Sequence, residues 1–154
     1  MTATKKTTSR GASASGWTDE ERAAMKEHVA ELKKEKGRGG KTSAAAGLAD
    51  LLEKIAQLPA EDRQMAERIH LVVMAAAPDL APRTWYGMPA WAKDGKVLCF
   101  FTPASKFKER YSSFGFNAVA NLDDGTMWPT SWAITKLSKA DEQRIGELVK
   151  QAVG

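Results

Sequence analysis

The segment Trp85-Tyr86-Gly87-Met88-Pro89-Ala90-Trp91 holds the side chains of this chain that are best suited to contact a ligand. Gly87 allows the backbone to turn or to approach another group closely, and Pro89 fixes the geometry beside it. Three aromatic rings flank this stiff turn. One interpretation is the wall of a ligand pocket, in which the rings give apolar contact and the phenol and indole groups orient the ligand. The other is a strand entry whose rings cap the core.

Three cations, Lys106, Lys108 and Arg110, occupy every second position of a later segment. In an extended strand alternate side chains point to the same side, so these cations would form one row. Such a row suits an anion-binding rim for phosphate or carboxylate groups. The alternative is a solvated edge strand whose charges prevent pairing with other chains.

Histidine, cysteine and serine residues give no catalytic or metal-binding pattern. His28 and His70 fall in different predicted helices and have no partner at ligand spacing. Cys99 is the only cysteine, so no intramolecular disulfide forms, which suits a reducing cytoplasm. No nucleophile has a nearby base in sequence, and no phosphate-binding glycine loop follows a strand. The sequence therefore favours a binding domain over an enzyme and predicts no catalytic residue.

Helical patterns precede and follow the aromatic segment. Thr18 and Glu21 form a capping-box pattern, which predicts a helix from about Asp19 to Lys36 with a thin apolar stripe and a mostly solvated surface. Two further helices follow a glycine-rich linker, one with an apolar face and one that begins near Pro59. Ser138 predicts the start of a last helix.

Strand patterns occupy most of the region between these helices. Asp94-Gly95 is a strong hairpin turn signal between the strands Met88–Lys93 and Lys96–Phe101. A third strand is expected within Lys106–Phe116. A fourth is expected from about Thr126 to Ile134, where proline implies an edge strand or a bulge. The order predicts an antiparallel meander between helices.

Both faces of the predicted sheet carry apolar side chains. In the second hairpin strand, strict alternation places Val97, Cys99 and Phe101 on one face and Leu98 and Phe100 on the other. The last strand adds a row on one face, formed by Trp128, Trp132 and Ile134. Helices could cover only one face, so an uncovered aromatic face is expected to be a pocket floor or a dimer surface.

Composition limits the classes of partner. Ten Lys or Arg against six Asp or Glu lie in residues 1–41, whereas the rest of the chain has thirteen of each. Nucleic-acid binding is therefore not expected of the folded domain, although Lys5, Lys6 and Arg10 in the basic N-terminal region could contact phosphates. The longest apolar run, Leu71–Ala77, is far shorter than the roughly 20 residues that span a bilayer. We expect a cytoplasmic protein.

The motif Tyr86-Gly87-Met88-Pro89-Ala90-Trp91, followed by Asp94-Gly95-Lys96-Val97 and Phe100-Phe101, resembles the YdhG-like domain family. That family was long catalogued as a domain of unknown function. Further segments resemble an actinobacterial-type subgroup: Lys106-Phe107, Arg110-Tyr111, Phe114-Gly115-Phe116, Asn121-Leu122-Asp123-Asp124-Gly125 and Met127-Trp128-Pro129. The resemblance covers roughly Leu48 to Val153.

The resemblance implies an α+β fold with an antiparallel sheet. Some family members are described as frataxin-like iron chaperones, a role expected to use exposed carboxylates on a helix and a sheet edge. In this chain Glu61, Asp62 and Glu67 are the acids that would serve. Iron is thus the one cofactor that the resemblance raises, and the balanced charge of the domain departs from the pattern of an acidic ridge.

The predicted fold is α+β, with a four- to five-stranded antiparallel sheet packed on N- and C-terminal helices and an extra N-terminal helix. Residues 1–16 are expected to be a disordered basic tail, 17–41 a solvated helix and linker, and 42–154 a YdhG-like domain. The leading hypothesis is a non-enzymatic domain that binds a small ligand or a protein partner on its aromatic sheet face, or dimerises there. The candidate ligand-binding residues are Trp85, Tyr86, Gly87, Met88, Pro89, Trp91, Phe101, Lys106, Lys108, Arg110 and Trp128.

Overall fold

The computed structural model describes residues 16–38 and 43–154. The predicted basic tail, apart from its last residue, and part of the predicted linker, residues 39–42, lie outside the described residues. No helix among the described residues is long and apolar enough to cross a bilayer.

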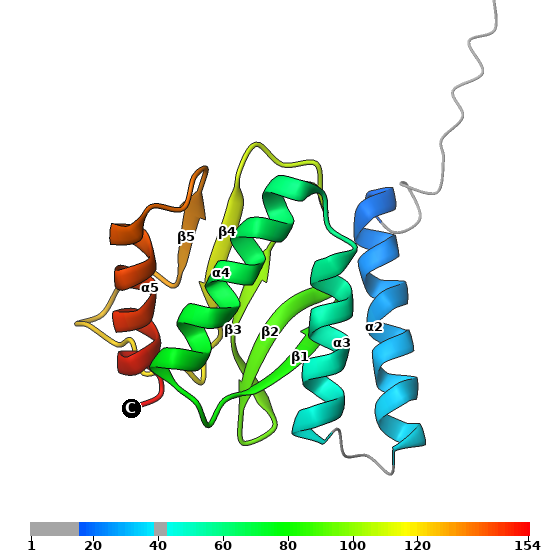
Figure 1. Ribbon diagram of the computed structural model, residues 1–154, viewed down its shortest axis with the longest axis horizontal. Helices are drawn as coiled ribbons and strands as arrows, with labels where there is room; N and C mark the ends of the chain where they lie inside the picture. Colours follow the sequence, from blue (N-terminus) through cyan, green and yellow to red (C-terminus); the bar gives the residue numbers. More distant parts are fainter. Residues whose placement is uncertain (1–15, 39–42) are drawn as a thin grey trace, which may run out of the picture.

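The fold is α+β, with three helices before an open antiparallel sheet and one helix after it (Figure 1). The helices are α2 (Asp19–Gly37), α3 (Ala44–Ala56), α4 (Ala60–Ala76) and α5 (Lys139–Ala152). The strands are β1 (Ala81–Trp85), β2 (Met88–Lys93), β3 (Lys96–Thr102), β4 (Ser112–Phe116) and β5 (Ser131–Ile134). They follow one another as a meander, β1-β2-β3-β4-β5, as predicted.

Local signals in the sequence account for the helix ends. The Thr18 hydroxyl accepts the Glu21 N–H, and the Glu21 carboxylate accepts the Thr18 N–H, which confirms the predicted capping box. Ser138 and Asp141 form the same arrangement at α5, and these bonds lower the pKa of the Asp141 carboxyl. Pro59 precedes α4, where its missing N–H removes no helical bond.

The strands differ from the prediction at three places. β1 was not predicted as a separate strand, and it pairs with β2 through the turn at Tyr86-Gly87. Residues 103–111 form turns, so the row of three cations on a strand is wrong, and β4 begins only at Ser112. β5 is shorter than predicted and begins after Pro129, which has no N–H to give to a ladder.

A bulge in the β2–β3 ladder changes the face of the sheet on which side chains of β3 lie. Trp91 pairs with Cys99 but Ala92 pairs with Val97, so Leu98 has no partner of its own on β2. Leu98 and Cys99 are both completely buried, whereas Val97 is half-exposed. The prediction that Val97 shares a face with Cys99 is therefore wrong, because strict alternation does not survive an extra residue.

The hydrophobic core lies between the helices α3, α4 and α5 and one face of the sheet, here called the helix face (Figure 1). Its largest fully buried side chains include Trp91, Phe101 and Phe114. The opposite face, here called the open face, carries Trp85 and Phe100, whose ring centroids lie 5.1 Å apart. Gly115 makes room there, since a Cβ at this position would lie 2.8 Å from the Phe100 ring.

The bulge gives a first test. Truncation of Leu98, on the helix face, should lower the stability of the fold strongly, whereas truncation of Val97, on the open face, should lower it little. We expect Leu98→Ala to lower the free energy of unfolding by about 2–5 kcal/mol, the usual cost of truncating a fully buried leucine. Val97→Ala should cost less than about 1.5 kcal/mol, since less surface leaves the core. Urea unfolding of the two variants decides the matter, and equal costs would contradict the bulge.

One buried polar contact links α4 to β2. Trp91 Nε1 donates to Nδ1 of His70 at 3.2 Å, and the two rings stack with centroids 6.1 Å apart. Burial lowers the pKa of His70 from its ordinary value of 6.5, because the charged imidazolium loses solvation. Protonation would also replace the acceptor nitrogen by a second donor facing the indole N–H.

A pH dependence follows from the lowered pKa of His70. The unfolded chain takes up the proton at higher pH than the folded one, so the stability due to neutral His70 is complete above about pH 6.5 and is lost as pH falls through the folded-state pKa. We expect the difference in unfolding free energy between wild type and His70→Gln to shrink from pH 7 to pH 5. Urea unfolding at both pH values measures it, and a difference that grows on acidification would contradict the assignment.

Candidate functional site

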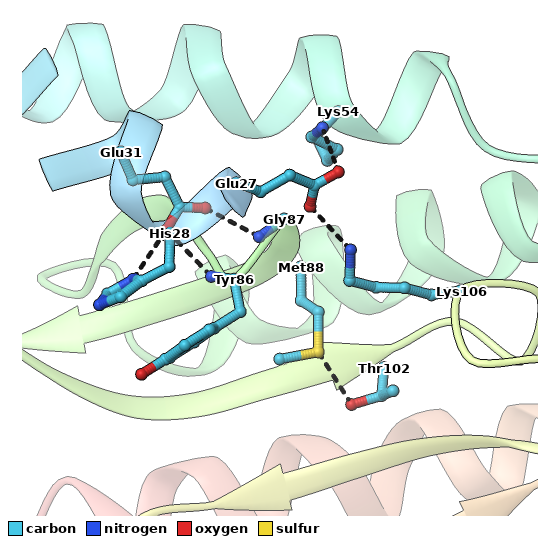
Figure 2. A network of polar contacts seen from close by, with 9 residues as sticks. All are labelled: Glu27, His28, Glu31, Lys54, Tyr86, Gly87, Met88, Thr102 and Lys106. Carbon is cyan, nitrogen blue, oxygen red and sulfur yellow. Dashed lines mark hydrogen bonds and ion pairs between the residues drawn. The ribbon is translucent and has the colours of Figure 1, made fainter. Parts of the chain in front are cut away.

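The turn between β1 and β2 is the centre of a polar network (Figure 2). Tyr86 and Gly87 both have positive φ angles, of 52° and 76°, as a two-residue hairpin turn that matches the strand twist requires. Tyrosine rarely adopts this conformation. The Glu31 carboxylate of α2 accepts both turn N–H groups, from Tyr86 at 2.9 Å and Gly87 at 2.8 Å. These two charge-assisted bonds hold the turn against α2.

Gly87 is required at this turn for two reasons. Its φ of 76° is strained for any residue with a Cβ, and a Cβ there would overlap the Glu27 carboxylate. That carboxylate also accepts from Lys106 Nζ at 2.7 Å and pairs with Lys54 Nζ at 3.6 Å. The sequence prediction that Gly87 allows a close approach is confirmed, and the approaching group belongs to the chain's own α2.

Aromatic rings surround the same turn. The His28 ring of α2 stacks on Tyr86 with centroids 4.0 Å apart and planes 14° from parallel. Its Nδ1 lies 3.3 Å from Glu31 Oε2, so one carboxylate orients both the turn and the ring. Trp85 meets Tyr86 edge-on at 4.9 Å. His28, Glu31 and Tyr86 thus lie together between α2 and β1 (Figure 2), and Trp85 contacts them through Tyr86.

Polar contacts hold α2 on the rest of the domain, and Ala24 is its only buried residue. Lys34 and Arg38 pair with Asp50 of α3, at 3.7 and 3.1 Å. Glu20 binds Lys108 at 2.9 Å, a contact that lowers the pKa of the carboxyl and raises that of the amine. The thin apolar stripe predicted for this helix is consistent with docking through charge.

A shallow trough of about 380 Å³ lies on the open face beside this assembly. Trp85 and Val97 come from strands, His28 comes from α2, and Val119 comes from the segment after β4. Its cations are Arg83 and Lys96, and no carboxylate lines it. The full lining is His28, Arg83, Trp85, Gly95, Lys96, Val97, Asn117, Ala118 and Val119.

The two cations of the trough make few hydrogen bonds or ion pairs with other described residues. Lys96 has no hydrogen-bond or ion-pair partner among the described residues, and Arg83 donates only through Nε, to the Thr84 carbonyl at 3.4 Å. A second cavity of about 160 Å³, between α2, α3 and β1, also touches Arg83. Its walls carry four carboxylates and four cations, several of them already paired with each other. The trough therefore has the greater surplus of positive charge.

The predicted site residues separate into three groups. Trp85 lies at the trough and Tyr86 at the neighbouring turn. Met88 is buried, and the Thr102 hydroxyl contacts its sulfur at 3.2 Å (Figure 2). Pro89, Trp91 and Phe101 lie on the helix face and are fully buried. Trp128 is half-buried and packs against the core.

The predicted anion rim is distributed differently. Lys106 and Lys108 are bound to Glu27 and Glu20 of α2, and the Arg110 guanidinium lies 5.1 Å from the centre of the Tyr111 ring. None of these cations lines the trough. Lys106 and Lys108 thus attach α2 to the rest of the domain.

Sequence reasoning missed His28, Arg83 and Lys96 as site residues. Arg83 stands two positions before Trp85 and would share its face once β1 was recognised. Lys96 follows the Asp94-Gly95 turn and appeared only as a strand end. His28 comes from α2, and no local pattern connects this helix to the sheet.

The described residues bring no three His, Cys, Asp or Glu side chains together where they could hold a metal ion. Asp62, one of the acids considered for iron, is buried and accepts the Ser105 N–H at 3.1 Å. Burial raises the pKa of the Cys99 thiol, which therefore stays protonated and unreactive.

The two hydrogen bonds that Glu31 accepts predict a variant in which α2 binds the rest of the domain more weakly. We expect Glu31→Gln to weaken docking by about 1–3 kcal/mol, because the amide offers one oxygen and no charge to the two N–H groups. Hydrogen exchange at the Tyr86 and Gly87 amides should then accelerate about tenfold or more. Glu35→Gln, on the same helix and without a side-chain partner among the described residues, is the matched control. Equal acceleration in both variants would contradict the role of Glu31.

The geometry of this site rests on the arrangement of α2, β1 and β3. No protein-family model, curated protein or solved structure matches this chain. The resemblance to YdhG-like domains therefore stays a prediction from motifs.

Proposed function

We propose that this protein is a small non-enzymatic binding domain whose open sheet face takes a planar anionic small molecule. The observation that carries the proposal is the trough of about 380 Å³, lined by Trp85, Arg83 and Lys96 and by no carboxylate. Its volume lies within the range of about 300–1,000 Å³ that is usual for small-ligand sites. Its surplus of positive charge selects an anion.

The recognition would combine stacking with charge. The Trp85 indole, fixed by contacts with Tyr86 and Phe100, offers its surface for apolar contact with a flat ring. The Arg83 guanidinium can bind a carboxylate or phosphate with two parallel hydrogen bonds, and Lys96 adds a second charge. His28 borders the opposite side and is already oriented by Glu31.

This proposal keeps the aromatic sheet face of the sequence prediction and changes its anchors. Arg83 and Lys96 take the part that Lys106, Lys108 and Arg110 were expected to play, since those cations do not line the trough. We also propose that the chain is a cytoplasmic member of the YdhG-like type, on the motifs that begin at Tyr86.

Two other functions stay predictions from the sequence. Iron delivery would use Glu61, Asp62 and Glu67, although the Asp62 carboxylate already binds a backbone N–H. Nucleic-acid binding would use the basic N-terminal region. No contact among the described residues favours either of them over the trough.

The test is binding of benzoate and indole-3-acetate to the purified full chain, with the corresponding neutral amides as matched probes. We expect the carboxylates to change tryptophan emission at concentrations where the amides do not. Arg83→Gln and Lys96→Gln together should weaken binding by about tenfold or more, the usual effect of losing charge-assisted bonds. Trp85→Leu should remove the emission change.

Lys33→Gln is the control, since this exposed lysine lies on α2 outside the trough. Circular dichroism of each variant should match that of the wild type. If neither carboxylate gives heat in calorimetry or a change in emission, or if the double variant binds as tightly as the wild type, the trough is not the ligand site.

A further inference from the structure

The outer edge of β5 is a surface that pairs with no other strand of the described residues. β5 ends the sheet, with β4 on one side and no strand among the described residues on the other (Figure 1). Phe116 N–H donates to the Thr130 carbonyl, so these two residues are a hydrogen-bonded pair of the antiparallel ladder. Such pairs alternate with pairs that are not hydrogen-bonded. The N–H and C=O groups of Trp132 and Ile134 thus point to β4, and those of Ser131 and Ala133 point to the free edge.

Most of the features that usually prevent an edge strand from pairing with another chain are missing from β5. β5 has the sequence Ser-Trp-Ala-Ile, without charge or proline, and Pro129 lies before its first residue. Lysine, proline, an inward charge or a covering segment commonly blocks such an edge. Within the part of the chain that the structure describes, the shortness of β5 is the restriction on pairing that remains, so the edge can accept a short extended segment.

A groove of mixed polarity lies between β5 and α5. Its volume is about 220 Å³, and its apolar lining includes Phe114, Trp132, Ile134, Ile145 and Leu148. In Figure 1 the helix α5 lies alongside β5 at this end of the sheet. A strand added to β5 would direct every second side chain towards this groove, because side chains alternate between faces.

The charges at the rim of the groove are predominantly positive. Lys136 and Arg144 line it, and neither has an ion-pair or hydrogen-bond partner among the described residues. The single acid in the lining, Asp141, is engaged by the Ser138 N–H at 2.9 Å as the cap of α5. The two unpaired cations therefore favour a binding partner that carries acidic groups.

We propose that β5 and α5 bind an extended acidic peptide segment of a partner protein by adding it to the sheet as a sixth strand. The backbone of the peptide pairs with Ser131 and Ala133. The peptide side chains that face the groove include an apolar one, which packs on its apolar lining, and acidic ones, whose carboxylates meet Lys136 and Arg144. This surface is separate from the trough, so the two sites can be tested independently.

A second copy of this chain fits the same edge less well. Antiparallel pairing of β5 with itself would bring the Lys136 and Arg144 side chains of both copies to one joined groove. The only carboxylate that lines each groove is Asp141, which already caps α5. Charge complementarity thus favours an acidic peptide over self-pairing.

The probes are two fluorescein-labelled hexapeptides in which threonine alternates with the series glutamate, valine, glutamate or with the series lysine, valine, lysine, so that one side of the extended chain carries both the apolar and the charged side chains. We expect the glutamate peptide to bind the full-length protein at least about tenfold more tightly than the lysine peptide, measured by fluorescence anisotropy. Lys136→Glu with Arg144→Glu should reverse this preference. Lys139→Glu with Lys150→Glu, two cations of α5 outside the groove, should leave it unchanged.

A change in the peptide tests the strand pairing without any risk to the fold. Methylation of the backbone nitrogens that face β5 should abolish binding of the glutamate peptide, and amide signals of Ser131 and Ala133 should shift only with the unmethylated form. Equal binding of both hexapeptides, no binding of either, or full binding of the methylated peptide would overturn the proposal. So would dimers of the wild type in sedimentation that shift the amide signals of Ser131 and Ala133 when no peptide is present.

Discussion

The carboxylate of Glu31, shared between the two turn N–H groups of Tyr86 and Gly87, is the contact on which the candidate site depends. It satisfies two backbone donors, sustains a positive φ angle at a tyrosine and positions the His28 ring. Together with the ion pairs that α2 makes through Glu20, Glu27, Lys34 and Arg38, it holds a polar helix with one buried residue beside β1. One carboxylate therefore connects the conformation of the turn to the shape of the neighbouring trough.

The sheet contributes a second constraint, which is the separation of its two faces. The bulge at Leu98 sends two consecutive side chains of β3 into the core and returns Phe100 to the open face. Phe100 then lies over Gly115, which has no side chain to displace it, and contacts the Trp85 ring. The aromatic residues of the chain thus form two layers with different roles, one structural and one accessible at the rim of the trough.

Much of the fold could be predicted from the sequence because its signals are local. The capping boxes at Thr18 and Ser138, the Asp94-Gly95 hairpin and the order of helices and strands all depend on neighbouring residues. The bulge at Leu98 was not predictable in this way, since it is a property of the pairing between two strands.

The candidate site was harder to predict because it is assembled across distant segments. Trp85 and Tyr86 were found from their setting around Gly87, but Trp91 and Phe101 went to the helix face with the core. Lys106 and Lys108 looked available in sequence, and their partners on α2 could not be inferred from spacing. Arg83 was overlooked together with the strand that carries it.

The composition of the core has a consequence for how this domain can change over evolution. The buried cluster draws on α3, α4, α5 and the sheet, and it contains no residue of α2. Substitutions along α2 can therefore alter the wall that His28 gives to the trough while the packing that specifies the fold stays the same. If the trough binds a ligand as proposed, substitutions in α2 would change its selectivity without a change in the core.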